Sequence, residues 1–112
     1  MREFAQHIAD MFSFLGIVRT KRMFSGYGLF LDGLMFALVI DDMLYLKADM
    51  ANRSIYTDRG LAPFTYQRQG KLVALSYYQA PEEMMDDPDE ALFWARCALA
   101  AARRADAGKR KS

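Results

Sequence analysis

Short turns between apolar runs constrain this chain more than any other feature of its sequence. Asp32-Gly33 is typical of the primed turn of a β-hairpin, because both residue types tolerate positive φ. Asp41-Asp42 and Gln69-Gly70 join further apolar runs at the same short spacing. Two strands joined by so few residues must be antiparallel. The sequence therefore predicts an antiparallel sheet, and a parallel or all-helical structure would contradict it.

The spacing of apolar residues assigns the rest of the chain to helices and strands. Apolar positions three and four residues apart predict a helix, and short apolar runs bounded by turn residues predict a strand. The expected helices are residues 3–16, 50–59 and 88–105, and the expected strands are residues 22–31, 34–40, 43–48, 63–68 and 71–79.

Polar residues mark the ends of the second and third helices. Asp49 can cap the N-terminus of the second, and Gly60 supplies a left-handed residue after its end. Asp87 can accept hydrogen bonds from the first-turn amides of the third helix, and Pro88 suits its first position. Glu90 stands where a capping box places a carboxylate. These residues agree with the helices that the apolar spacing predicts.

The predicted order is α-β-β-β-α-β-β-α, which describes an α+β domain with a five-stranded antiparallel sheet and flanking helices. A chain of 112 residues forms one domain and is long enough to bury a core. We expect this domain to span residues 1–106. Residues 107–112 are polar and basic, and we expect a flexible tail there.

The strand at residues 34–40, LMFALVI, is apolar on both of its alternations. Such a strand needs cover on both faces. Three helices of this size cover one face well, so we expect a homodimer, built on sheet or strand-edge residues, to hide the remainder. Tyrosine tolerates a partly wet margin. We therefore place Tyr45, Tyr66 and one of Tyr77 and Tyr78 at the edge of that interface.

Charge and cysteine content exclude several classes of protein. The net charge is +1, so no overall positive field draws the chain onto nucleic acid or an anionic membrane. A single cysteine, Cys97, excludes an intramolecular disulfide and fits a reducing compartment. The N-terminus lacks a signal-peptide core, and no run approaches the roughly 20 apolar residues of a membrane helix. We expect a cytoplasmic protein without membrane contact.

The segment MFSGYGLFLDG, residues 23–33, raises the question of a nucleotide-binding loop. A dinucleotide fingerprint places its glycines between a strand and a helix, but here a strand and a hairpin follow Gly28. We therefore interpret Gly26 and Gly28 as a bulge or a close backbone approach within the sheet. The alternative is a small-ligand or anion site, or an uncharacterised enzyme, in a cleft near both glycines, with Arg22 or Lys47 as the anion contact.

Side chains that could carry other chemistry are few and scattered. His7 borders the apolar stripe of the first helix, Cys97 lies near a small-residue stripe on the last, and no third residue is placed to orient such a pair. The acidic run at residues 82–90 lacks the ligand spacing of an EF-hand, and helix capping with solvent exposure explains it. Basic groups at residues 19–22 and 103–111 offer weak phosphate contacts without a recognition helix. We expect no catalytic, cofactor or metal site and no specific nucleic-acid binding.

Several short motifs follow one another along nearly the whole chain. They are RMFSGYG (22–28), LDGLMFA (31–37), LYLK (44–47), ANR (51–53), GLAPF (60–64), SYYQAP (76–81) and WAR (94–96). In this order they resemble the N-terminal domain of the TfoX (Sxy) family of competence regulators. Family members commonly carry glycine where Ser25 stands here. The resemblance implies an α+β sandwich like that of secretion chaperones.

The same resemblance implies a non-enzymatic regulatory or protein-interaction domain. Known members of the family act beside a cyclic-AMP receptor type activator and carry a second, C-terminal domain, which we expect this chain to lack. Its protein partner is unknown, and a transcription activator is the kind that the resemblance suggests. The residues that we expect to contact a partner or ligand are Arg22, Met23, Phe24, Gly26, Gly28, Lys47, Tyr77 and Tyr78.

Overall fold

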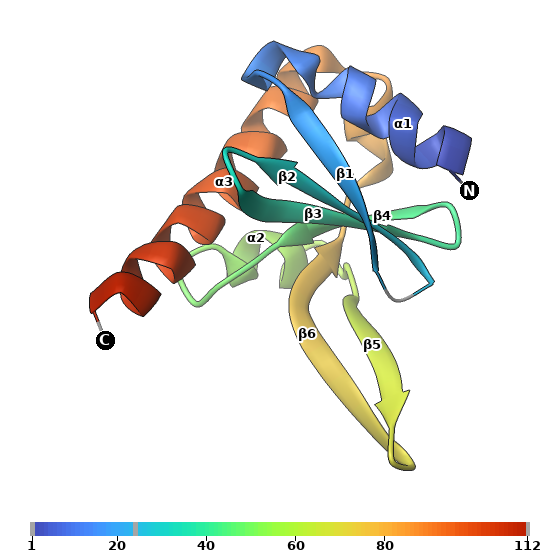
Figure 1. The fold of residues 1–112 in the computed structure, drawn as a ribbon, viewed down its shortest axis with the longest axis vertical. Helices are drawn as coiled ribbons and strands as arrows, with labels where there is room; N and C mark the ends of the chain where they lie inside the picture. The colour runs from blue at the N-terminus through green and yellow to red at the C-terminus, as the bar shows by residue number, and fades with distance from the viewer. Residues whose placement is uncertain (1, 24, 112) are drawn as a thin grey trace.

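Six strands form one sheet in a computed structural model that describes the backbone of residues 2–23 and 25–111 and the side chains of residues 3–23 and 25–108. The strands are β1 (Val18–Met23), β2 (Gly26–Leu31), β3 (Leu34–Ile40), β4 (Met43–Lys47), β5 (Pro63–Arg68) and β6 (Lys71–Gln79). Their spatial order is β1-β2-β3-β4-β6-β5, and every neighbouring pair is antiparallel (Figure 1). The predicted α+β fold with an antiparallel sheet is confirmed.

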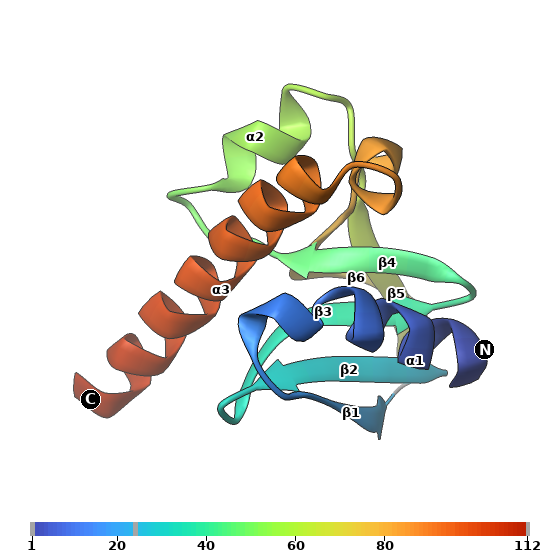
Figure 2. The ribbon, with the colours of Figure 1, turned by 90° about the horizontal axis from the view of Figure 1, so that it is seen from above.

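Helical segments cover one face of this sheet. They are α1 (Arg2–Met11), the 3-10 turn η1 (Ser13–Leu15), α2 (Arg53–Thr57), the 3-10 turn η2 (Glu82–Met85) and α3 (Pro88–Lys111). α1 packs against β1 and β2, and α3 packs against β3 and β4. Figure 2 shows α1 running along the strands while α3 crosses them obliquely. Each helix in the described part of the chain is too short or too polar to cross a membrane.

The three predicted turns share the backbone geometry of primed hairpin turns. Asp32 and Gly33 have φ values of 52° and 79°, which confirms the primed turn expected there. The other two turns also have positive φ at both central residues, Asp41 and Asp42 in one and Gln69 and Gly70 in the other. These turns join β2 to β3, β3 to β4 and β5 to β6.

The predicted number of five strands is wrong by one. The sequence predicts a single strand over residues 22–31, whereas the structure has β2 over Gly26–Leu31 and a further strand, β1, that begins at Val18 and pairs with β2 as a hairpin. β1 lies at the edge of the sheet with Arg19, Lys21 and Arg22 exposed. Charged edge strands resist pairing with a foreign sheet, but their charges also remove the apolar alternation that identifies a strand. The observed order is α-β-β-β-β-α-β-β-α, and the expected likeness to secretion chaperones stays a prediction.

The helices differ from the prediction mainly at their ends. The first α-helix stops at Met11, and η1 then carries the chain to Gly16, whose φ is 134°. The second helix has only five residues, and Gly60 after it has the expected positive φ, 71°. The last helix continues beyond residue 105 to Lys111. A domain that ends at residue 106 and a flexible tail beyond it stay predictions.

Aromatic side chains fill the core between the helices and the sheet. Phe36 of β3 packs against Phe12 with ring centroids 5.5 Å apart, and both side chains are fully buried. Tyr56 of α2 lies between Trp94 of α3, at 5.2 Å, and Tyr78 of β6, at 5.4 Å. This aromatic stack therefore joins three elements that are distant in the sequence.

The opposite face of the sheet, called here the second face, is covered by the chain itself. Leu38 and Ile40 of β3 are buried there in a small cluster with Phe64 of β5 and Tyr77 of β6. The β5–β6 hairpin that supplies this cover extends beyond the other strands (Figure 1). A second copy of the chain is thus not required to bury Leu38 and Ile40. The homodimer itself stays a prediction, which light scattering at micromolar concentration can test.

Gly26 allows β2 to approach β3 more closely than a side chain would permit. A Cβ atom at Gly26 would overlap the carbonyl oxygen of Val39 and lie 2.9 Å from Cγ1 of Ile40. At Gly28 the nearest atoms are the sulfurs of Met35, at 2.9 Å, and Met23, at 3.0 Å. Flexible methionine side chains can move aside, whereas a backbone carbonyl cannot do so cheaply. The close backbone approach expected from the sequence is therefore present at Gly26.

We predict that Gly26→Ala lowers the free energy of unfolding by about 3 kcal/mol or more, because the new methyl group overlaps fixed backbone. Gly28→Ala is the matched control and should cost about 1 kcal/mol, since two thioethers can shift. Urea unfolding followed by circular dichroism measures both values. Equal costs for the two substitutions would contradict the close approach at Gly26.

Candidate functional site

Lys47 and Tyr77, two residues expected from the sequence, lie side by side on β4 and β6. The ammonium nitrogen of Lys47 is 5.0 Å from the centre of the Tyr77 ring, and it donates a hydrogen bond to Oγ of Ser76 at 2.9 Å. The Tyr77 hydroxyl donates to the carbonyl of Met35 at 3.2 Å, and burial raises the pKa of Tyr77 to about 12. The Lys47 ammonium and the Tyr77 hydroxyl thus both interact with other groups of the protein.

A cavity of about 250 Å³ opens beside this pair. Phe30, Met35, Lys47 and Tyr77 line it together with the end of α3, including Asp106. An anion in this cavity would have to compete with Ser76 and the Tyr77 ring for the lysine, and it would face the carboxylate of Asp106. This arrangement does not favour the anion site that the sequence left open.

The other expected residues do not gather at one site. Arg22 is exposed on β1, and two strands, β2 and β3, lie between β1 and the β4 strand of Lys47. Tyr78 faces the helices, where it stacks on Tyr56. The space above Gly26 and Gly28 is filled by Val39, Ile40, Met35 and Met23 rather than open as a cleft. Phe24 lies outside the described residues.

Motif residues around α2 have structural roles. Asn52 is buried, and its side-chain amide donates to the carbonyls of Lys47 at 3.3 Å and Cys97 at 3.1 Å. Asp49 accepts two hydrogen bonds from the Arg104 guanidinium, at 2.6 and 2.9 Å, and this contact holds the pKa of Asp49 below its usual value. The bonds to Cys97 and from Arg104 fasten the segment before α2 to α3. The sequence gives no sign of these pairings, because the partners are 45 and 55 residues apart.

The isolated histidine and cysteine do not form a reactive pair. His7 is exposed on α1, whereas Cys97 is half-buried on α3. Burial raises the pKa of the Cys97 thiol, which disfavours the nucleophilic thiolate. The exposed position of His7 agrees with its expected place beside the apolar stripe of the first helix.

The acidic run between β6 and α3 is partly used in local contacts. Asp87 accepts hydrogen bonds from the N–H groups of Asp89, at 3.0 Å, and Glu90, at 3.4 Å, as expected for a helix cap. Arg59 pairs with Glu83 at 2.7 Å and with Glu90 at 3.8 Å. Within the described residues, no group of three or more histidine, cysteine or acidic side chains is placed to hold a metal ion.

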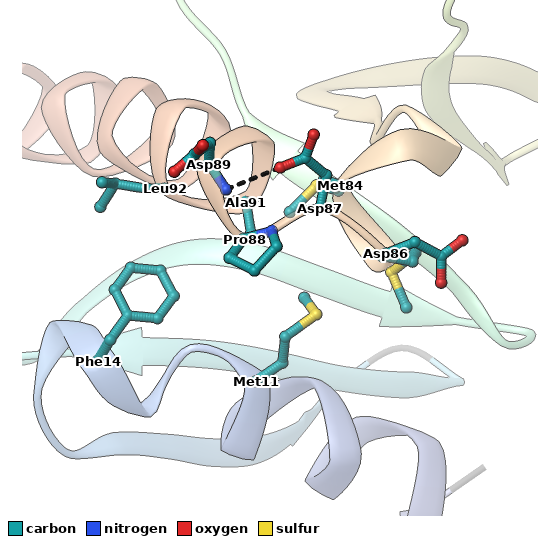
Figure 3. Close-up of a pocket in the computed structure, with 10 residues that line it drawn as sticks. Met11, Phe14, Met84, Asp86, Asp87, Pro88, Asp89, Ala91 and Leu92 are labelled. Carbon is teal, nitrogen blue, oxygen red and sulfur yellow. Dashed lines mark hydrogen bonds between the residues drawn. The ribbon is translucent and has the colours of Figure 1, made fainter.

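A larger apolar groove lies between α1 with η1 and the start of α3. Its volume is about 430 Å³. Figure 3 shows Met11 and Phe14 on one side of it, with Pro88 and Leu92 on the other. This surface is called the α1–α3 groove, and its lining residues are Met11, Phe14, Met84, Met85, Asp86, Asp87, Pro88, Asp89, Ala91 and Leu92.

Sequence reasoning did not identify this groove. Phe14 is the clearest signal in the sequence, because it lies off the apolar stripe of the first helix, and its side chain is 51% exposed. The adjacent Met84 and Met85 within the acidic run at residues 82–90 are a second signal, since methionines are common on binding surfaces. Single exposed apolar residues are ordinary, however, and only the fold brings these together.

Most of this chain matches a known protein family. The family model described as the TfoX N-terminal domain matches residues 10–102, which include all six strands. Protein Sxy of Escherichia coli (strain K12) is 31% identical over 70 residues, amounting to 62% of this chain and 34% of that protein. The chain thus matches about a third of the length of this curated relative.

The exposure of Phe14 predicts that it contributes little to stability. Phe14→Ala should lower the free energy of unfolding by less than about 1 kcal/mol, because half of the side chain is already in water. Phe12→Ala is the matched control and should cost about 3–5 kcal/mol, since Phe12 is fully buried. Thermal and urea unfolding measure both. A large cost for Phe14→Ala would mean that this ring belongs to the core and is not available for binding.

Proposed function

The chain belongs to the TfoX N-terminal domain family, and from this premise we propose that it is a non-enzymatic regulatory domain that acts by binding another protein. The family match is the observation that carries the proposal, because it extends from the first helix to the last. A competence-regulator-like role follows from that membership. The matched relative is about three times as long as the matched segment. We therefore propose for this chain only a role that a single domain can perform, which is the binding of a regulatory partner.

The side-chain chemistry supports binding rather than catalysis. Tyr77 and Lys47 engage each other and neighbouring groups on the second face, and Cys97 has a raised pKa. His7 lies on α1, away from the strands that carry that pair. An enzyme needs a nucleophile or base with an orienting partner. The described residues offer instead an apolar groove whose aromatic residue is exposed, as suits an interface with another protein.

A transcription activator is the partner that we propose, in the cytoplasm, on the strength of family membership alone. Direct, specific recognition of nucleic acid is not part of the proposal. The basic side chains of β1 lie on an edge strand, and the described helices do not form a helix-turn-helix that would present a recognition helix.

A regulatory role predicts that deletion of the gene changes the transcript levels of a defined set of genes. Expression of the chain from a plasmid should restore those levels, because the domain acts on transcription through its partner. Transcript profiling of wild-type, deleted and complemented cells across growth phases measures this effect. Expression of the Gly26→Ala variant is the control for loss of the folded domain. Identical profiles in wild-type and deleted cells at every phase would contradict the proposal.

A further inference from the structure

Apolar side chains that line the α1–α3 groove are partly exposed to solvent. Phe14 is 51% exposed and Met85 is 36% exposed. Three of the residues that line the groove are methionines: Met11 is half-buried, Met85 is exposed and Met84 forms the buried floor. Methionine is flexible and polarisable, so methionine-rich surfaces adapt to the side chains of a partner. The groove therefore suits an apolar helix face better than a rigid small molecule.

The rim of this groove is acidic. Its described lining residues include Asp86, Asp87 and Asp89 but no lysine or arginine. The nearby carboxylates of Glu83 and Glu90 are paired with Arg59, so the unbalanced negative charge lies on the aspartates. The N-terminus of α3 contributes about half a positive charge, which three carboxylates outweigh. A cationic partner is favoured at this rim, and an anionic partner is repelled.

We propose that the α1–α3 groove binds a basic amphipathic helix of a partner protein. This inference rests on the proposed function, protein binding, and names the chemistry of the partner. The apolar face of the helix packs onto Met11, Phe14 and Leu92, and lysine or arginine residues at its end approach Asp86 and Asp89. The groove lies between helical elements, and helices that bind in this way present anchors at positions i, i+3, i+4 and i+7.

The experiment below separates this occupant from two others. A purely apolar ligand would leave the carboxylates of Asp86 and Asp89 without a counter-charge. A second copy of the chain would have to present a basic helix to the groove, and its binding would appear as self-association. Both occupants give results in the experiment that differ from those of a basic partner helix.

The test is selection from a displayed library of random helical peptides of about 15 residues, a length at which an isolated helix becomes marginally stable. The full chain is the target. Enriched peptides should carry a net positive charge and apolar residues at helical spacing. Fluorescence anisotropy with the strongest peptide should then show at least about tenfold weaker binding to Phe14→Ala.

Charge variants test the rim separately. Asp86→Asn combined with Asp89→Asn should weaken binding severalfold at low salt, and this difference should shrink as salt rises from about 0.05 to 0.5 M. Leu72→Ala, at an exposed apolar residue on β6, and Asp58→Asn, at an exposed acidic residue after α2, are matched controls that should leave binding unchanged. Circular dichroism verifies that each variant is folded.

Several results would overturn the inference. These are enrichment of neutral or acidic peptides, failure to enrich any peptide, equal binding by Phe14→Ala, or self-association that Phe14→Ala abolishes. The transcript experiment distinguishes failure of the groove proposal from failure of the proposed regulatory function. If cells that express Phe14→Ala regulate transcripts as wild-type cells do, the groove is not the binding site but the domain still regulates. If deletion changes no transcript, the proposed function itself fails.

Discussion

The fold depends on one requirement, which is that both faces of β3 must be removed from water. Phe36 projects toward the helices and packs on Phe12, whereas Leu38 and Ile40 project toward the second face. Burial of each such side chain contributes roughly 1.5–3 kcal/mol. α1 and α3 cover the first face, and the β5–β6 hairpin covers the second. The domain therefore needs its longest hairpin as much as its helices.

This division of cover decides where apolar surface remains. Both faces of the sheet carry buried apolar clusters, and the edge strand β1 carries exposed charges. Apolar surface remains, among other places, where α1 and the start of α3 approach each other without closing. Asp87 caps α3 at this point, and Arg59 pairs with Glu83 and Glu90 beside it. The same local contacts that begin the helix thus also shape the proposed binding surface.

Local signals in the sequence were sufficient for much of the fold. The strands at residues 34–40, 63–68 and 71–79 have the predicted bounds, because each is an apolar or aromatic run between turn residues. β1 could not be recognised, since its charges suit an edge position and erase the apolar alternation. The cover of Leu38 by Phe64 and Tyr77 could not be predicted either, because it depends on how the β5–β6 hairpin curves relative to β3.

The candidate site was even less accessible from the sequence. Lys47 and Tyr77 come from two separate motifs and are neighbours on β4 and β6. Most of the motif residues serve the fold: Gly26 allows a close approach and Tyr78 stacks on Tyr56. The bond from Asn52 to Cys97 is long-range and has no local signature. The groove arises from exposed residues, whose grouping in space is set by the packing of α1 against the sheet rather than by any pattern within α1.

Thiol labelling tests most directly the claim that the chain covers both faces of β3 and leaves the α1–α3 groove open. Leu38→Cys and Phe14→Cys would each be made in a Cys97→Ala background and labelled under native conditions. We predict rapid labelling at position 14 and protection at position 38 by several factors of ten, because each 1.4 kcal/mol of opening free energy slows labelling about tenfold. The protection at position 38 should be the same after about tenfold dilution. Labelling at position 38 that is rapid, or that becomes faster on dilution, would contradict the account, since the second face would then be open or covered by another copy of the chain.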